Sequence, residues 1–301
     1  MHSARVKRRT VVAPRGEALK SLLIRELGLT PAASDSLLER GAVYVDGKRV
    51  TEGRVLGEGS KVTIVLEEAG ASTNQPLALA ALEVPTLYED HDVVVVNKPA
   101  GLPAQPTPGG AQSVLDVVSS RLGRLAGLVH RLDKDTSGVT IFGKNPKATS
   151  RLAAAFREGT AKKRYLAITG PGLAQQGSID LPLSKDPSRP GRWRASSAAN
   201  GIEAHTLYER LFSGEQFCVV ALTPLTGRTH QLRAHLTSLG APIVGDTLYG
   251  GSPAFARCLL HAQHLAIDGK AFEAPLPADF VEVLARVGLT PTSFQMAASL
   301  P

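Results

Sequence analysis

A short polar run in the middle of the chain contains the residue types best suited to chemistry. Residues 130–138 read His-Arg-Leu-Asp-Lys-Asp-Thr-Ser-Gly and lie between two apolar segments. This pattern places the run on a loop where one buried strand ends and another begins, and loops on a rigid scaffold commonly carry functional side chains. Because charged groups are costly there without a partner or a substrate, Arg131, Asp133 and Lys134 indicate an active-site loop.

A calcium-binding loop is one alternative interpretation of this run. Asp133, Asp135 and Ser137 have the spacing of the first three ligands in such a loop, and Gly138 follows them as the loop requires. The twelfth position of a calcium loop needs a bidentate glutamate, but Lys144 occupies it here. A cation in place of a ligand argues against calcium.

The histidines provide a second metal alternative. His230 and His235 are five residues apart on a predicted helix, which separates them by about 140° around its axis, so they do not easily share an ion. His261 and His264 would lie on opposite faces of a strand, and neither pair has a nearby acidic partner. We therefore expect no metal site, and we expect these side chains to be hydrogen-bonded structural histidines or phosphate contacts.

A second basic segment, residues 225–235, is predicted to lead into a helix capped by Thr229. One apolar stripe of this helix is formed by Leu232, Leu236 and Leu239. Arg233 lies at the margin of that stripe, where a half-buried arginine needs an anion. Asp133 is a candidate, because a guanidinium would hold a carboxylate ionised and fixed in direction. The alternative is an arginine whose head reaches solvent along its own stem.

The elements that must position these residues follow from capping, turn and periodicity signals. In the first 66 residues these signals predict two helices, a hairpin and a strand, at 17–27, 34–40, 42–50 and 61–66. Later strands are predicted at 92–97, 164–169, 179–183, 204–212, 216–223 and 257–267. Later helices are predicted at 145–156, 229–239 and 278–287. A strand-rich domain after a small module predicts an α+β fold with a mixed, mainly antiparallel sheet.

Composition and charge limit the class of protein. The chain has 301 residues, 43% of them apolar, without the run of roughly 20 apolar residues that a membrane span needs. The basic start lacks the apolar segment of a secretory signal. Cys218 and Cys258, 40 positions apart, fit reduced residues, so we expect a soluble, cytoplasmic protein. The first 66 residues hold 12 Lys or Arg against 7 Asp or Glu, which suits either a surface that guides polyanions or a solubilising one.

Six segments in order along the chain resemble the RluA-type pseudouridine synthases. The run at 130–138 resembles the signature of that family, and the other matching segments are 97–101, 156–158 with 163–167, 226–235, 245–250 and 260–262. The resemblance covers about residues 83–285. It implies a catalytic domain at 83–288, a tail at 289–301, and an enzyme that isomerises uridine in RNA to pseudouridine without cofactor, metal or energy source.

The first module, residues 1–68, resembles more loosely the alpha-L RNA-binding domain that often precedes this catalytic domain, with a linker at 69–82. Its helix-turn region at 30–36 has no basic residue, where relatives commonly carry arginine or lysine. The candidate substitutes for contact with an RNA backbone are Arg40, Lys48, Arg49 and the basic arm at 5–9.

The resemblance also implies roles for individual residues. Asp133 matches the catalytic carboxylate, which either attacks the sugar or acts as a base in a glycal-forming route. Tyr165 matches a tyrosine that stacks on the flipped uracil and is proposed to help remove the proton from carbon 5, and Arg233 matches the arginine that pairs with Asp133. Asp135 competes for the catalytic role, since an extended loop would place it on the same side as Asp133. Further RNA- or substrate-binding residues are expected at His130, Arg131, Lys134, Thr136, Lys98, Arg228 and His230.

RNA is therefore the expected partner, and the alpha-L-like module favours large-subunit ribosomal RNA over transfer RNA. Two other functions stay open: a non-catalytic RNA-binding or ribosome-assembly protein that keeps the fold, and a metal-dependent hydrolase that uses the histidines with Asp133 and Asp135. Loss of Asp133, Tyr165 or Arg233 would signal the first, and all three are present. The second requires a ligand spacing that the chain lacks. We expect a monomer without a cofactor.

Overall fold

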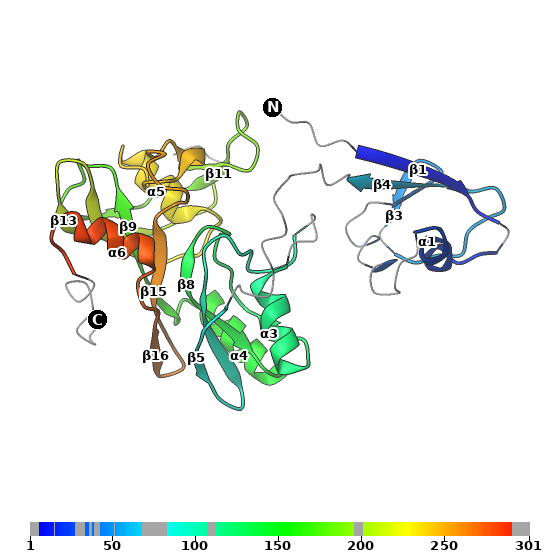
Figure 1. Ribbon diagram of the computed structural model, residues 1–301, viewed down its shortest axis with the longest axis horizontal. Coiled ribbons are helices and arrows are strands. Elements are labelled where there is room, and N and C mark those ends of the chain that lie inside the picture. Colours follow the sequence, from blue (N-terminus) through cyan, green and yellow to red (C-terminus); the bar gives the residue numbers. More distant parts are fainter. Residues whose placement is uncertain are drawn as a thin grey trace. The chain divides into compact units, whose positions relative to one another are not determined.

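The computed structural model describes residues 6–14, 16–27, 34–35, 38, 43–50, 52–67, 83–107, 112–195 and 201–290 (Figure 1). The chain divides into two compact units, residues 1–81 and 82–301. The predicted linker at 69–82 lies outside the described residues, as does the predicted tail from residue 291 onward. Each unit has a hydrophobic core of its own.

The first unit consists of a four-stranded sheet and a helix. The sheet has the order β1-β4-β2-β3, with β1 at Val6–Val12, β4 at Lys61–Glu67, β2 at Val43–Val45 and β3 at Lys48–Val50. Helix α1, Leu19–Leu27, buries Leu19, Leu22 and Leu23 in the core of this unit. The predicted hairpin turn is confirmed, because Asp46 and Gly47 both have positive φ, 50° and 78°.

The first unit differs from the sequence-based expectation in its basic N-terminal segment. The segment expected to be a basic arm is part of β1 from Val6 onward, and it pairs with β4 along its whole length, Val6 opposite Glu67 and Val12 opposite Lys61. The count of charges concealed this strand, because Lys7, Arg8 and Arg9 interrupt the alternation of apolar and polar residues that would have predicted it. Most of the predicted second helix, including Arg40, lies outside the described residues.

The second unit is built on a ten-stranded sheet. Its strand order is β10-β13-β14-β9-β15-β8-β6-β5, with β16 paired to β15 and β7 paired to β8. The strands are β5 (Thr86–Glu89), β6 (Val93–Lys98), β7 (Gly127–Leu128), β8 (Ser137–Gly143), β9 (Lys162–Thr169), β10 (Gln176–Ile179), β13 (Thr206–Ser213), β14 (Cys218–Pro224), β15 (Leu260–Ile267) and β16 (Lys270–Glu273). Within the described residues the pairs of this sheet are antiparallel except β15 with β8. The predicted α+β fold with a mixed, mainly antiparallel sheet is confirmed.

Helices cover both faces of this sheet, as the alternation along β6 requires. Val93 and Val95 pack in one core with α4 (Pro146–Arg157), whereas Val94 and Val96 pack in another with α3 (Val114–Leu122). Because neighbouring strand residues point to opposite faces, α3 and α4 lie on opposite sides of β6. Further along the sheet, α5 (Gln231–Ser238) and α6 (Ala278–Ala285) share the core formed by β9 and β14 (Figure 1).

Two strand predictions were wrong in detail. The strand predicted at 179–183 is two strands, β10 and β11 (Leu183–Lys185), and Pro182, which has no backbone N–H to give to a sheet, lies between them. β11 pairs instead with β12 (Trp193–Ala195) in a separate hairpin. The strand predicted at 257–267 begins only at Leu260, and the turn after it leads into β16, so it is not the last strand.

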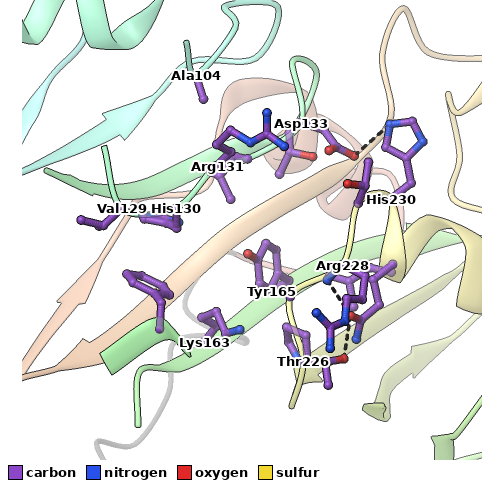
Figure 2. A pocket seen from close by; sticks show the side chains of 18 of the residues that line it. Ala104, Val129, His130, Arg131, Asp133, Lys163, Tyr165, Thr226, Arg228 and His230 are labelled. Carbon is purple, nitrogen blue, oxygen red and sulfur yellow. Dashed lines mark hydrogen bonds and ion pairs between the residues drawn. The ribbon is translucent and has the colours of Figure 1, made fainter. Parts of the chain in front are cut away.

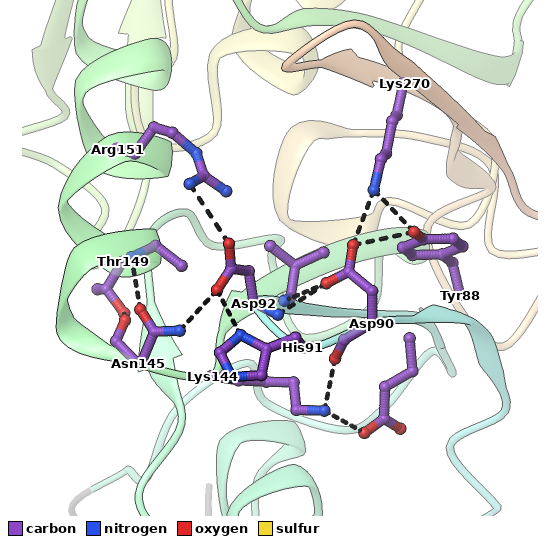
Figure 3. A network of polar contacts seen from close by, with 12 residues as sticks. Tyr88, Asp90, His91, Asp92, Lys144, Asn145, Thr149, Arg151 and Lys270 are labelled. Carbon is purple, nitrogen blue, oxygen red and sulfur yellow. Dashed lines mark hydrogen bonds and ion pairs between the residues drawn. The ribbon is translucent and has the colours of Figure 1, made fainter.

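A polar network fixes the turn between β5 and β6 (Figure 3). Asp92 accepts a hydrogen bond of 2.8 Å from Asn145, whose own Oδ1 caps α4 as predicted. Lys144 donates to the Asp90 carbonyl at 2.6 Å and to Glu89 at 2.7 Å. The residue that argues against calcium therefore has a structural role in this turn.

Candidate active site

The loop at 130–136 forms a tight turn at the centre of the sheet. The Thr136 amide donates to the Asp133 carbonyl at 3.1 Å, which leaves Lys134 and Asp135 at the middle of the turn. An extended loop would have placed Asp133 and Asp135 on one side, but the loop turns at Lys134 and Asp135. Asp133 lines the cavity of this site, whereas Asp135 does not.

Two basic side chains, the buried Lys98 and the partly buried Arg257, hold this turn by its backbone. The fully buried Lys98, at the end of β6, donates to the Lys134 carbonyl at 2.8 Å, and Gly101 donates to the same oxygen at 2.9 Å. Arg257 donates to the Asp135 carbonyl at 3.0 Å and is itself paired with Asp279. Lys98 was expected to bind substrate, but it supports the loop from below and does not line the cavity.

The parallel contact between β8 and β15 explains the glycine that ends the polar run. Gly138 has φ of 118°, and a Cβ atom there would lie 2.1 Å from the Ala262 carbonyl oxygen of β15. Next to it, the Ser137 hydroxyl and His261 Nδ1 are 2.9 Å apart. Residues 124 positions apart in the chain are thereby joined directly below the loop.

Asp133 faces a guanidinium and an imidazole ring from the segment of α5. Arg233 donates from Nη1 to Asp133 Oδ2 at 3.2 Å. His230 Nε2 lies 3.8 Å from the same oxygen, and Figure 2 shows this contact. The carboxylate is 29% exposed, so it is open to the cavity while one edge is held by the guanidinium. The predicted pairing of Arg233 with Asp133 is present in the structure.

Arg233 is itself held by a second carboxylate. It donates from Nε to Asp246 Oδ2 at 2.6 Å and from Nη2 to Asp246 Oδ1 at 2.8 Å. Burial alone would lower the pKa of Arg233, but the hydrogen bonds and charge of Asp246 outweigh it and raise that pKa. Arg233 therefore stays a cation that spans the two carboxylates.

The start of α5 departs from the prediction. His230, and not Thr229, is the N-cap, with φ of 55° and no capping hydrogen bond from its side chain. Gln231 compensates by accepting hydrogen bonds from the Thr226 hydroxyl and the Arg228 amide at 2.8 and 3.0 Å. The left-handed backbone at His230 turns its ring toward Asp133. Leu239, predicted in the buried stripe, lies past the helix end and is 40% exposed.

The cavity beside Asp133 has a volume of about 920 Å³. Tyr165, on the central strand β9, forms part of its wall together with Lys163. In the view of Figure 2, Tyr165 lies between the loop that carries Arg131 and the segment that carries Arg228. Burial, and secondarily the charge of Asp133, raises the pKa of Tyr165, so its side chain is a neutral phenol.

The other predicted site residues fall into two groups. Arg131, Lys134 and Arg228 are exposed and line the cavity, where they are accessible to a polyanion. His130 stacks on Phe156 with ring centroids 4.4 Å apart and accepts a hydrogen bond from the Ile141 amide, while Thr136 is buried. Burial lowers the pKa of His130 to about 3, so this ring is neutral and supports the loop.

Several residues that shape the site were not assigned roles from the sequence. Asp246 and Tyr249 both contact Arg233, and Arg257 holds the loop. The segment 245–250 was part of the resemblance, and Gly245 in it could have indicated a close backbone contact. Gly245 has φ of 81°, and a Cβ atom there would lie 1.7 Å from the Arg257 carbonyl oxygen. Arg257 stands in a segment without a motif, so nothing in the sequence marked it.

Comparison with known proteins agrees with this geometry. The sequence profile of the family described as RNA pseudouridylate synthase matches residues 92–238. An uncharacterised RNA pseudouridine synthase of Zymomonas mobilis is 41% identical over 209 residues, which span 65% of this chain and 95% of that protein. The chain belongs to the RNA pseudouridine synthase family. Its members are isomerases that act on uridines in RNA, so the predicted family and enzyme class are confirmed.

Other pseudouridine synthases are similar over most of the chain. Ribosomal large subunit pseudouridine synthase D of Nitrosomonas europaea is 32% identical over 279 residues, 85% of this chain and 80% of that one. The structure of human RNA Pseudouridylate Synthase Domain Containing 4 superposes with a TM-score of 0.58 at 29% identity, over 67% of this chain and 92% of that chain.

Neither a metal-binding cluster nor a membrane-spanning helix is found among the described residues of this pseudouridine synthase. No group of three or more His, Cys, Asp or Glu side chains is placed to share a metal ion within the residues that the structure describes. In that same part of the chain, no helix has both the length and the apolar character that crossing a membrane would require.

Proposed function

We propose that this pseudouridine synthase uses Asp133 as its catalytic carboxylate and acts on large-subunit ribosomal RNA without a cofactor. The observation that carries the proposal is the position of Asp133, which is open to a cavity on one side and paired with the Arg233 guanidinium at 3.2 Å on the other. An ionised carboxylate held in this way has a defined direction and a free oxygen edge for reaction.

The reaction needs no group beyond those that line the cavity. The bond between uracil N1 and ribose C1′ breaks, the base turns over, and C5 bonds to C1′. The proton lost from C5 is balanced by the proton that N1 gains. A carboxylate serves either route to this product, because it forms an adduct with the sugar that also leaves again, or it removes a proton on the way to a glycal.

Tyr165 supplies a face for the base that has left its stack. A flipped base loses stacking in the RNA and regains it on an aromatic ring, and Tyr165 stands on a rigid central strand at the wall of the cavity. Because burial raises its pKa, Tyr165 enters the reaction as a neutral phenol. Any proton that it takes from C5 requires its own phenolic proton to pass to an acceptor at the same time.

The exposed cations at the rim suit the RNA backbone. Arg131 and Lys134, on the loop at 130–136, and Arg228, on the segment before α5, all line the cavity, and none of their side chains is buried. Phosphate contacts from such residues position an RNA strand without reading its sequence. They would bring a uridine to Asp133 once it is flipped out.

The target class is inferred from similarity and charge. The relative from Nitrosomonas europaea is named for the large ribosomal subunit and matches 85% of this chain. A net charge of +7 favours association with RNA. Transfer RNA is the alternative, and mapping pseudouridines in both RNA classes from cells with and without the gene separates them: a loss confined to transfer RNA contradicts the ribosomal target.

Asp133→Asn and Asp135→Asn test the catalytic assignment. Tritium release from 5-tritiated uridine in RNA measures the loss of the C5 proton directly. We expect release at background for Asp133→Asn and near the unaltered rate for Asp135→Asn, because Asp135 does not line the cavity. Full activity of Asp133→Asn would refute the assignment. Activity that survives exhaustive dialysis against EDTA supports a reaction without a metal, and its loss contradicts it.

A further inference from the structure

One buried tyrosine connects the residues around Asp133 to a separate hairpin. Tyr249, in the short 3₁₀-helix η2 (Thr247–Tyr249), is 3% exposed. Its hydroxyl oxygen lies 2.9 Å from the backbone nitrogen of Trp193, on the β11–β12 hairpin, and 3.1 Å from His230 Nδ1. Tyr249 therefore stands between the hairpin and the catalytic carboxylate's neighbours.

The donor and the acceptor in each hydrogen bond of the Tyr249 hydroxyl are determined by elimination. A backbone N–H is always a donor, so the Tyr249 oxygen accepts from Trp193. Its own proton then has one partner among the described residues, His230 Nδ1. A neutral imidazole that accepts at Nδ1 carries its proton on Nε2, and Nε2 lies 3.8 Å from Asp133 Oδ2.

The ionisation states of Tyr249 and His230 are consistent with these donor and acceptor assignments. Burial raises the pKa of Tyr249 to about 12, so the hydroxyl keeps the proton that it donates. Burial also lowers the pKa of His230 from its ordinary value, which favours the neutral ring with a single N–H.

The ring of Tyr249 also contacts the partner of Asp133. The guanidinium carbon of Arg233 lies 4.8 Å from the ring centroid, and that of Arg192, on the hairpin, lies 5.2 Å from it. Both distances suit cation–π contact. The same side chain thus contacts Arg233 through its face and His230 through its hydroxyl.

We propose that Tyr249 is a positioning residue, which fixes His230 as the tautomer with its N–H toward Asp133 and braces Arg233, and which the β11–β12 hairpin holds in place. This inference rests on the proposed role of Asp133. It assigns a purpose to the unusual backbone of His230, because φ of 55° is costly for a residue other than glycine and here brings its ring between Tyr249 and Asp133.

The wild-type protein gives the first test, independent of activity. In a long-range ¹⁵N–¹H spectrum of histidine-labelled protein, the signals of His230 are assigned by their absence in His230→Gln. We expect the shifts of an unprotonated Nδ1 and a protonated Nε2. A protonated Nδ1 would overturn the proposal whether or not Asp133 is the catalytic residue.

Tyr249→Phe gives the second test, since it keeps the ring and removes only the hydroxyl. We expect kcat for tritium release to fall about tenfold with KM unchanged, and His230 to become a mixture of tautomers. The matched control is Tyr208→Phe on β13, whose hydroxyl contacts none of these residues and whose loss should leave kcat unchanged. An unchanged kcat, a change in KM alone or an unchanged tautomer would each overturn the proposal, whereas full activity of Asp133→Asn would refute the proposed function instead.

Discussion

Asp246 holds Arg233 by two hydrogen bonds, 2.6 Å to Nε and 2.8 Å to Nη2, and its carboxylate is only 1% exposed. A two-point contact of this kind fixes the plane of the guanidinium as well as its position. Nη1 is the nitrogen left over, and it points to Asp133. The direction of the guanidinium that pairs with Asp133 is therefore determined by a carboxylate that does not line the cavity.

Asp246→Asn should reduce turnover far more than RNA binding. An amide replaces one acceptor by a donor, so the two-point contact is lost and Arg233 no longer has a fixed plane. We expect kcat to fall about 100-fold, as misplacement of a catalytic group by about 1 Å does, and stability to fall by about 3 kcal/mol because a buried ion pair loses one partner. Single-turnover rates, RNA affinity and urea unfolding measure these effects. Asp268→Asn, which removes a pair with Arg151 outside the cavity, is the control, and an equal loss of turnover there contradicts a specific role for Asp246.

Lys98 should make the stability of the protein depend on alkaline pH. Burial lowers its pKa to about 7 from the ordinary 10.5. Between these values the unfolded chain binds one more proton than the folded protein, so the free energy of unfolding should rise with pH, by at most about 1.4 kcal/mol per pH unit. The contribution is complete above the ordinary value and is lost as pH falls toward 7.

Urea unfolding of the wild type and of Lys98→Met between pH 7 and 9.5 isolates this contribution, because other groups titrate equally in both proteins. The difference between the two should grow with pH. A neutral amine still has two N–H groups for the carbonyls of Pro99 and Lys134, so the loop contacts survive deprotonation. A difference that does not change with pH would show that Lys98 titrates normally.

Gly138→Ala should destabilise the junction of β8 with β15. Its φ of 118° is strained for alanine, and the new Cβ would lie 2.1 Å from the Ala262 carbonyl oxygen. We expect a loss of about 3 kcal/mol or more from strain and overlap together. Gly101→Ala is the matched control: φ is 83° with no atom within 4 Å, so a loss of about 1 kcal/mol is expected. Equal losses in urea unfolding would mean that the close approach of β15 has no influence.

Arg131→Gln and Lys134→Gln should weaken RNA binding through salt-dependent contacts. If each side chain neutralises one phosphate, each substitution should make the slope of log affinity against log salt concentration less steep by about 0.7. Titrations at several salt concentrations measure the slope. Lys147→Gln, an exposed cation on α4 outside the cavity, should leave it unchanged. Unchanged slopes for the loop variants would exclude them from the phosphate contacts.

Local hydrogen bonds made some elements predictable. Asn145 before Pro146 predicts the start of α4, and the structure has that cap, because the side chain bonds an amide three residues away. Asp46-Gly47 predicts a hairpin turn for another local reason: a two-residue turn needs positive φ at both positions, and these residue types accept it. The order of the motifs also identified the family and indicated the loop that carries Asp133.

The geometry of the site depended on contacts that no local pattern specifies. Asp133 and Asp135 are of the same type and two residues apart, and in the sequence only the match to the family motif distinguishes them. In the structure the turn closed by Thr136 separates them, and Lys98 and Arg257 hold the carbonyls of that turn. Arg233 is 100 residues from Asp133, and their contact exists because β8 and β15 meet in the middle of one sheet.

The sequence by itself thus determined the family, the fold class and the residues able to do the chemistry, because these depend on residue type and on neighbours within a turn or a helix. Only the tertiary structure decided which carboxylate faces the cavity, that Asp246 orients Arg233, and that Tyr249 joins His230 to a hairpin. Those relationships are set by strand pairing and core packing between distant segments, where many residues together determine the position of each one.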